Sequence, residues 1–155
     1  NVILFTILFY FSLDIIAQPD SSIVRKKMKH CVSFGFLQGG GSLLGVDFET
    51  LVFKNWGLQI GGGLVGFGAA INFHFEPDKD IRSSFLSLTY WHQGIGQSYA
   101  QSLLGPSIVY RAKKWFTCQL GIGIPTGIGP ALEKKSNYVQ PPAILLYSIG
   151  IYHIV

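Results

Sequence analysis

Charge is scarce in this chain of 155 residues, because Asp, Glu, Lys and Arg make up only 13% of it. Ordinary soluble domains contain roughly 25% of these residues. A long hydrophobic run is also missing: the apolar stretch from Val2 to Leu13 has about 12 residues, whereas a membrane-spanning helix needs roughly 20. The two cysteines, Cys31 and Cys118, form no CxxC or other metal-ligand pattern. These absences leave no zinc-binding motif and no candidate transmembrane helix.

The short apolar stretch has the size of the h-region of a secretory signal peptide. Asp14 ends it, and Ala17 supplies a small residue where a peptidase could cut before Gln18. We therefore predict a signal peptide over residues 1–17. We expect it to be incomplete, because the chain starts at Asn1 without a Met or a basic n-region.

A basic linker is predicted over residues 18–29. It holds much of the excess positive charge of a chain whose formal net charge is +4. Such a run could contact an anionic partner, but a solvated linker between signal and fold is the simpler interpretation. We expect no nucleic-acid partner.

Strand-forming patterns are abundant in the rest of the chain, which contains 19 glycines and 14% aromatic residues. Apolar and polar residues alternate with a period of two between turn residues, and no long stretch has a helical period. We predict eight strands, near residues 31–37, 43–53, 56–63, 67–75, 83–92, 102–112, 115–124 and 143–153.

Each predicted strand has one apolar face and one small or polar face. A soluble barrel would turn the apolar face inward, and its exterior would then be Gly, Ser, Gln and Thr with few Lys or Glu, an unusual surface in water. A membrane barrel inverts the assignment. The charges within strands, Asp47, Glu49 and Arg111, all fall on the polar face, as the cost of charge in lipid requires.

The predicted fold class is therefore all-β: a single eight-stranded antiparallel transmembrane β-barrel, an up-and-down meander over residues 30–155. A soluble periplasmic ligand-binding β-barrel remains as an alternative. Short connections at 54–55, 76–81 and 113–114 alternate with longer ones at 93–101 and 125–142, as periplasmic turns alternate with outer loops. Aromatic residues beside the short connections predict an interfacial girdle, which includes Trp56, Tyr110, Trp115 and Phe116.

Pro106 conflicts with this map, because a proline inside a strand removes a ladder hydrogen bond. Either the strand is bulged there or it starts at Ser107. The other prolines fall outside the predicted strands. Cys31 and Cys118 fall on non-neighbouring strands and opposite faces, so we expect no disulfide.

Four polar residues form a predicted cluster in the barrel lumen: Asp47, Glu49, Arg111 and His74. Paired carboxylates can perform acid–base chemistry or bind a cation, but a structural cluster that fills the barrel is the favoured interpretation. Arg111 could reach Glu49 from the opposite wall. We expect no metal and no cofactor. Eight strands enclose only enough room for side chains, so an open pore is not expected.

His92 falls on the lipid face near the outer rim, with Ser102 across from it on the next strand. Such a pair would suit a hydrolase that acts on an outer-leaflet lipid. No Asp or Glu lies near either residue in the sequence to orient the histidine, so a rim histidine at headgroup level is favoured and an enzyme is not expected. The Gly39–Gly41 and Gly61–Gly63 runs are predicted hairpin turns and crowded lumen positions, because no P-loop Lys follows.

Three stretches resemble the small eight-stranded outer-membrane β-barrel proteins, in particular an uncharacterised family typical of Bacteroidetes. They are GLQIGGGLVGFGAAINFHF, SFLSLTYWHQGIGQSYAQSLLGPSIVYRAKKWFTCQLGIG and AILLYSIGIY, with the Ala17–Gln18 export junction. The resemblance implies the fold, insertion into the bacterial outer membrane and lipid as a partner, but no activity. The outer loops, which include Glu133, Lys134, Lys135 and Tyr138, could bind a surface partner.

Overall fold

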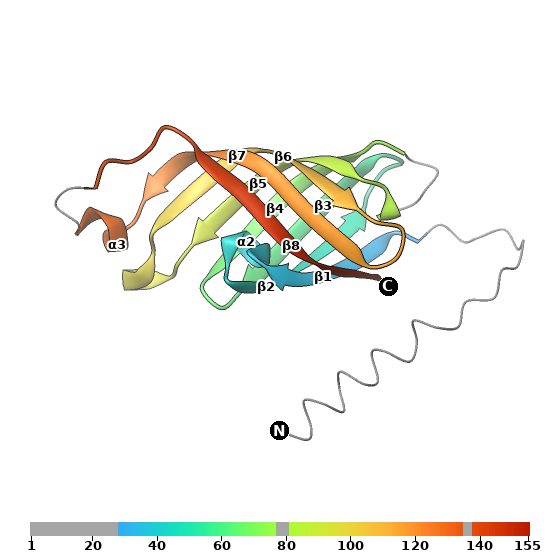
Figure 1. Cartoon of the computed structure of the whole chain (residues 1–155), viewed down its shortest axis with the longest axis horizontal. Coiled ribbons are helices and arrows are strands. Elements are labelled where there is room, and N and C mark those ends of the chain that lie inside the picture. The colour runs from blue at the N-terminus through green and yellow to red at the C-terminus, as the bar shows by residue number, and fades with distance from the viewer. Residues whose placement is uncertain (1–27, 77–80, 135–137) are drawn as a thin grey trace, which may run out of the picture.

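The chain forms a closed antiparallel barrel of eight strands in which each strand pairs with the next and the last pairs with the first (Figure 1). The structure is a computed structural model that describes residues 28–76, 81–134 and 138–155. The predicted signal peptide and all but the end of the predicted linker lie outside these ranges. The predicted fold class, an all-β eight-stranded meander, is confirmed.

The strands match the predicted ones to within two residues at every boundary except the end of the seventh strand, which continues four residues further. They are β1 (His30–Phe36), β2 (Leu44–Leu51), β3 (Trp56–Gly63), β4 (Gly66–His74), β5 (Phe85–Gln93), β6 (Gln101–Arg111), β7 (Phe116–Ile128) and β8 (Ile144–Ile154). The short helical turns in the connections include α2 (Gln38–Gly41), η2 (Gly96–Ser98) and α3 (Pro130–Glu133). Within the described ranges, no helix is long and apolar enough to cross a membrane.

Side-chain exposure alternates along the strands, as the sequence pattern predicts. On β2, Val46 and Phe48 are exposed, whereas Asp47 and Glu49 between and beside them are buried. The apolar face therefore lies on the outside of the barrel, and the small and polar face lines the lumen. Cys31 points into the lumen and is buried, Cys118 is half-buried on β7, and both are free thiols.

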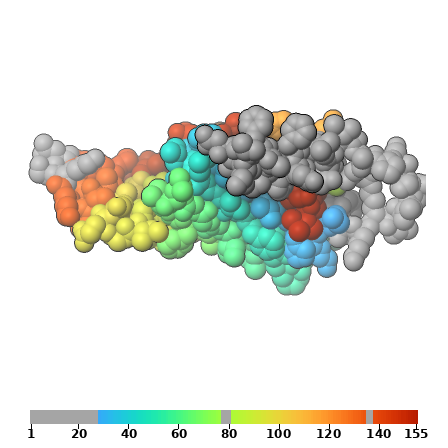
Figure 2. Space-filling view, turned by 90° about the horizontal axis from the view of Figure 1, so that it is seen from below, coloured from blue at the N-terminus to red at the C-terminus, as the bar shows by residue number. Residues whose placement is uncertain are grey.

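The two ends of the barrel differ. The chain termini of the described part and the connections 52–55, 75–84 and 112–115 lie at one end, called here the terminus end. The other, the loop end, is uneven: the β5–β6 and β7–β8 hairpins extend well beyond the β3–β4 turn (Figures 1 and 2). Backbone hydrogen bonds join the two long hairpins, since Gly129 N–H donates to Ala100 O over 2.7 Å and Ala131 N–H donates to Tyr99 O over 3.0 Å.

Two prolines lie inside strands, which corrects the prediction that only Pro106 does so. β6 runs unbroken through Pro106, and neither Gly105 nor Pro106 has a ladder partner on β7. The register shift lies instead between Ser102 and Leu103. Pro125 lies within β7 beyond Gly123, where pairing with β8 ends. β7 is an edge on that side, which is where a strand tolerates proline.

A left-handed turn closes the barrel at the loop end. Leu37, Gly39, Gly40 and Gly41 all have positive φ, and α2 folds inward so that Gln38, Gly39 and Gly40 are buried. A Cβ on Gly40 would lie 2.0 Å from the carbonyl oxygen of Phe67, so only glycine fits. The glycine run is a hairpin connection, as predicted, but the sequence pattern did not reveal that this connection enters the lumen.

The β4–β5 connection closes the terminus end. It spans residues 75–84 and is longer than the predicted 76–81, because its last part packs into the barrel mouth and β5 starts only at Phe85. Ile81 is fully buried there in a cluster with Cys31, Leu51 and Tyr152. Both mouths are therefore closed by the chain's own connections.

Candidate functional site

A charged cluster occupies the lumen near the terminus end, with Glu49 at its centre. Arg111 Nη2 lies 2.7 Å from Glu49 Oε2, and His74 Nε2 lies 3.0 Å from Glu49 Oε1. The amide of Asn72 also donates to Glu49 Oε1. All of these side chains are buried, so the carboxylate has a cation and two further partners in a site without solvent. The predicted contact of Arg111 with Glu49 across the lumen is confirmed.

Aromatic rings and the β4–β5 connection hold Arg111 and His74 in place. The Arg111 guanidinium lies 4.8 Å from the centre of the Phe85 ring and 5.2 Å from that of Tyr152. It also donates to the Ile81 carbonyl oxygen. His74 Nδ1 lies 2.8 Å from Ser83 Oγ, so both nitrogens of this imidazole have partners.

Hydroxyl and amide groups fill the rest of the lumen. Ser87 Oγ donates to Asn72 over 2.6 Å and lies 2.9 Å from Thr89 Oγ1, while Gln119 donates to Ser107 Oγ over 2.7 Å. An internal cavity between them has a volume of about 10 Å³, which is room for about one water molecule. In the part of the chain that the structure describes, the lumen is therefore a filled polar core.

Asp47 lies on the same face as Glu49 but has separate partners. Its two carboxylate oxygens accept the Gly39 N–H at 3.2 Å each, which ties α2 to the wall. The two carboxylates therefore do not share a site that could hold a substrate. Among the residues that the structure describes, no three or more His, Cys, Asp or Glu side chains form a group suited to a metal ion.

A second polar cluster, called here the rim cluster, lies on the outside of the wall near the loop end. His92 Nδ1 lies 2.9 Å from Ser102 Oγ, since the two residues are directly paired across β5 and β6. The hydroxyl groups of Tyr90 and Tyr99 lie 3.1 and 2.8 Å from the same oxygen. The predicted proximity of His92 and Ser102 is thus confirmed.

Aromatic stacking fixes the His92 ring. The imidazole lies between Phe67 and Tyr99, with ring centres 4.5 and 4.4 Å away. Ser102 can donate to His92 while it accepts from both tyrosines, which satisfies a hydroxyl that is only 5% exposed. No Asp or Glu within the described ranges hydrogen-bonds to His92. The rim cluster thus contains a nucleophile and a base but no carboxylate.

Sequence reasoning missed several members of both clusters. Asn72 and Tyr90 precede His74 and His92 by two residues on the same face, so the strand period could have found them. Tyr99 lies in the β5–β6 loop, and no sequence pattern places it. Ser83 falls at the start of the predicted strand 83–92, but the structure places it in the inward-folding connection before β5.

The predicted girdle residues all lie on the outside of the barrel at the terminus end, Trp56 on β3 and the others on or beside β6 and β7. Trp56, Tyr110 and Trp115 are about half exposed, and Phe116 is half-buried. Trp56 packs edge-on against Phe73 with ring centres 5.2 Å apart.

No protein-family model, no curated protein and no solved structure matches this chain. What the clusters do is therefore inferred from their own geometry and chemistry.

Proposed function

We propose that this chain is a bacterial outer-membrane β-barrel, exported through residues 1–17, that acts by structure or by surface interaction rather than by transport. The observation that carries the proposal is the apolar exterior. Large hydrophobic side chains are exposed on all eight strands, among them Phe34, Phe48, Ile60, Ile71, Leu88, Ile108, Leu120 and Ile149. Such a surface is unfavourable in water and is suited to a lipid environment.

Strand length supports the same proposal. A tilted strand needs about 9–11 residues to cross a bilayer, and β4 to β8 have 9, 9, 11, 13 and 11 residues. β1 to β3 have 7 or 8 residues. The apolar side chains of Leu43, Leu64 and Val65 continue the exterior past the ends of these shorter strands.

Two aromatic levels bound the apolar band. The girdle with Trp56, Tyr110 and Trp115 lies at the terminus end, and Phe67, Tyr90 and Tyr99 of the rim cluster lie near the loop end. Aromatic side chains with a polar tip favour membrane interfaces, so this spacing of two belts suits a barrel in a bilayer. A soluble barrel would need the apolar face inside, which is the reverse of the observed arrangement.

The closed lumen favours display over conduction. With both mouths closed and charges paired inside, solute passage is not expected. The joined β5–β6 and β7–β8 hairpins form the largest projection at the loop end, where Lys134 Nζ donates to Gln97 over 3.1 Å. We propose that this projection is the surface that a partner would contact.

The test is heat modifiability of the protein in an isolated membrane fraction. A closed membrane barrel should sediment with the outer membrane and migrate differently in SDS before and after boiling. A protein that stays in the soluble periplasm and shows no shift would overturn the proposal.

The His92–Ser102 contact favours a second candidate function, hydrolysis of an acyl ester in an outer-leaflet lipid. Ser102 Oγ would attack the ester carbonyl carbon while its proton passes to His92 Nδ1, and the alcohol would leave with that proton. Water would then release the acid from Ser102 through His92, which returns the proton to the serine. The hydroxyl groups of Tyr90 and Tyr99, which contact Ser102 Oγ in the structure, would have to turn toward the developing oxyanion to donate to it.

This second candidate is tested with a fluorophosphonate probe on the folded barrel. The wild type should be labelled, and Ser102→Ala and His92→Ala should lose the label. Ser107→Ala, which removes a lumen hydroxyl, should be labelled like the wild type. An unlabelled wild-type barrel removes this function.

A further inference from the structure

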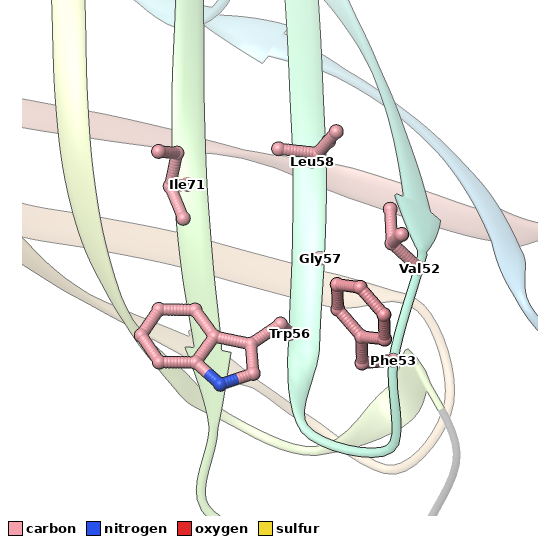
Figure 3. A pocket seen from close by; sticks show the side chains of 6 residues that line it. All are labelled: Val52, Phe53, Trp56, Gly57, Leu58 and Ile71. Atoms are coloured by element: carbon pink, nitrogen blue, oxygen red, sulfur yellow. The ribbon is translucent and has the colours of Figure 1, made fainter.

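An apolar groove of about 280 Å³ lies on the outer wall at the terminus end. Val52 and Phe53 from the β2–β3 turn, Trp56 and Leu58 from β3, and Ile71 from β4 line it (Figure 3). Trp56 packs edge-on against Phe73 of β4, with ring centres 5.2 Å apart. Figure 3 shows the rings of Trp56 and Phe53 on opposite sides of β3, with Leu58 above them.

The groove opens to the outside of the barrel, as the exposure of its lining shows. Phe53 is 70% exposed, and Val52, Trp56, Leu58 and Ile71 are each close to half exposed. In a membrane, this apolar wall faces lipid tails, and the Trp56 indole N–H is its polar group. An indole at this level can lie among headgroups while its ring contacts chains.

Positive charge predominates at the terminus end, and Lys54 lies in the turn that lines the groove. Lys54 follows Phe53 directly in the turn, is exposed, and forms no ion pair within the described part of the chain. Exposed or half-exposed cations at this end outnumber carboxylates among the described residues: Lys29, Lys54, Arg82, Lys113 and Lys114 against Glu76. Such a cluster beside a bilayer attracts anionic headgroups.

We propose that the groove and Lys54 form a binding site for one anionic phospholipid of the leaflet at the terminus end. One acyl chain lies in the groove, and the phosphate contacts the Lys54 ammonium and the Trp56 indole N–H. The site rests on the proposed function, because it requires the barrel to be in a bilayer. It adds a specific ligand to a surface that would otherwise only contact lipid chains.

The chemistry predicts a preference for headgroup charge. A lysine near an anionic lipid surface strengthens binding by about fivefold. A zwitterionic lipid with the same chains can fill the groove but gains little from Lys54. Filling the groove with a side chain should weaken the binding of both lipids. Removing the lysine should remove only the preference for the anionic lipid.

The experiment is a native mass spectrometry titration of the full folded chain in detergent micelles with phosphatidylglycerol or phosphatidylcholine of identical acyl chains. The wild type should retain one phosphatidylglycerol at concentrations about fivefold lower than phosphatidylcholine. Leu58→Trp should reduce retention of both lipids. Lys54→Gln should make the two lipids equivalent.

Two control variants make the outcome specific. Lys114→Gln removes a cation at the same end outside the groove, and Leu120→Trp enlarges an exposed side chain on β7, so both should bind like the wild type. Equal retention of the two lipids by the wild type would overturn the site. If Lys114→Gln reduced the preference for phosphatidylglycerol as much as Lys54→Gln does, the site would also be overturned. Diffuse electrostatic attraction at this end of the barrel would then explain the preference.

Migration in cold SDS, measured on the same samples, separates the two proposals. A barrel that shifts on boiling but does not distinguish the lipids overturns the lipid site alone. A chain that shows no shift and does not associate with membranes overturns the proposed function, and the lipid site with it.

Discussion

Two histidine–serine pairs lie on opposite sides of the same barrel wall. In the lumen, His74 Nδ1 lies 2.8 Å from Ser83 Oγ, and on the outside His92 Nδ1 lies 2.9 Å from Ser102 Oγ. The lumen pair has a carboxylate on the second ring nitrogen, since His74 Nε2 lies 3.0 Å from Glu49. The rim pair is held instead by two aromatic stacks and two tyrosine hydroxyls.

The difference shows that the composition of a catalytic triad and access to a substrate are separate properties. Ser83, His74 and Glu49 form the complete set of group types, but Arg111 pairs with Glu49 and the closed mouths exclude a substrate. His92 and Ser102 face the outside but lack the acid that would orient the imidazole. We therefore expect the lumen pair to govern stability and the rim pair to govern any chemistry.

The largest expected effect on stability comes from Glu49→Ala, which disrupts the charged cluster in the lumen. The Arg111 guanidinium then stays buried without its counter-ion, which should lower the free energy of unfolding by about 3–5 kcal/mol. Urea titration of the barrel in lipid vesicles measures it. Glu133→Ala, at an exposed loop carboxylate, should change the value by less than about 0.5 kcal/mol. Equal effects would show that Glu49 is not a buried anchor.

Gly40→Ala tests the closure of the barrel mouth by α2, which keeps substrates away from the lumen pair. Its Cβ would meet the Phe67 carbonyl, so α2 must leave the mouth, and we expect a loss of about 2 kcal/mol or more. Gly96→Ala is the matched control, because Gly96 also has positive φ but nothing lies within 4 Å of its Cβ position. It should show only the backbone strain, about 1 kcal/mol. Similar losses in both variants would contradict the steric role of Gly40.

The direct comparison is His74→Ala against His92→Ala. The first removes one hydrogen-bond partner from each of two buried groups, Glu49 and Ser83, and should cost about 3 kcal/mol. The second loses stacking at a partly exposed site and should cost about 1 kcal/mol. Unfolding in urea ranks the two, and a larger loss in His92→Ala would reverse the assignment of roles.

Tyr99→Phe should have the smallest effect. It keeps the ring stacked on His92 and removes one of the three hydrogen-bond partners of the Ser102 hydroxyl, so the expected change is about 0.5–1 kcal/mol. Tyr99→Ala, which also removes the stack, should cost more in the same urea titration. If the two variants matched, the stacking would contribute nothing.

The strand period made the barrel predictable, because the strands from β1 to β8 alternate between apolar residues on the outside and small or polar residues in the lumen. The same period placed Asp47, Glu49, Arg111 and His74 on one face and His92 with Ser102 on the other. The strand period could not predict the paths of the connections between strands. Ser83, Ile81 and α2 enter the lumen through turns whose path depends on close packing, and Tyr99 reaches Ser102 from a loop. Pro125 within β7 was missed because its tolerance depends on where β8 pairing ends.

Barrel closure joins the two most distant strands in the described chain. β1 pairs with β8 from Cys31–Ile154 to Phe36–Ile149, so this seam forms only after all the other strands have been made. Seams between such remote segments are slow to form, and until then both strands present free edges that can pair with other chains. We therefore expect the six residue pairs of this seam to form late in assembly, and β1 and β8 to be the edges most open to aggregation until they do.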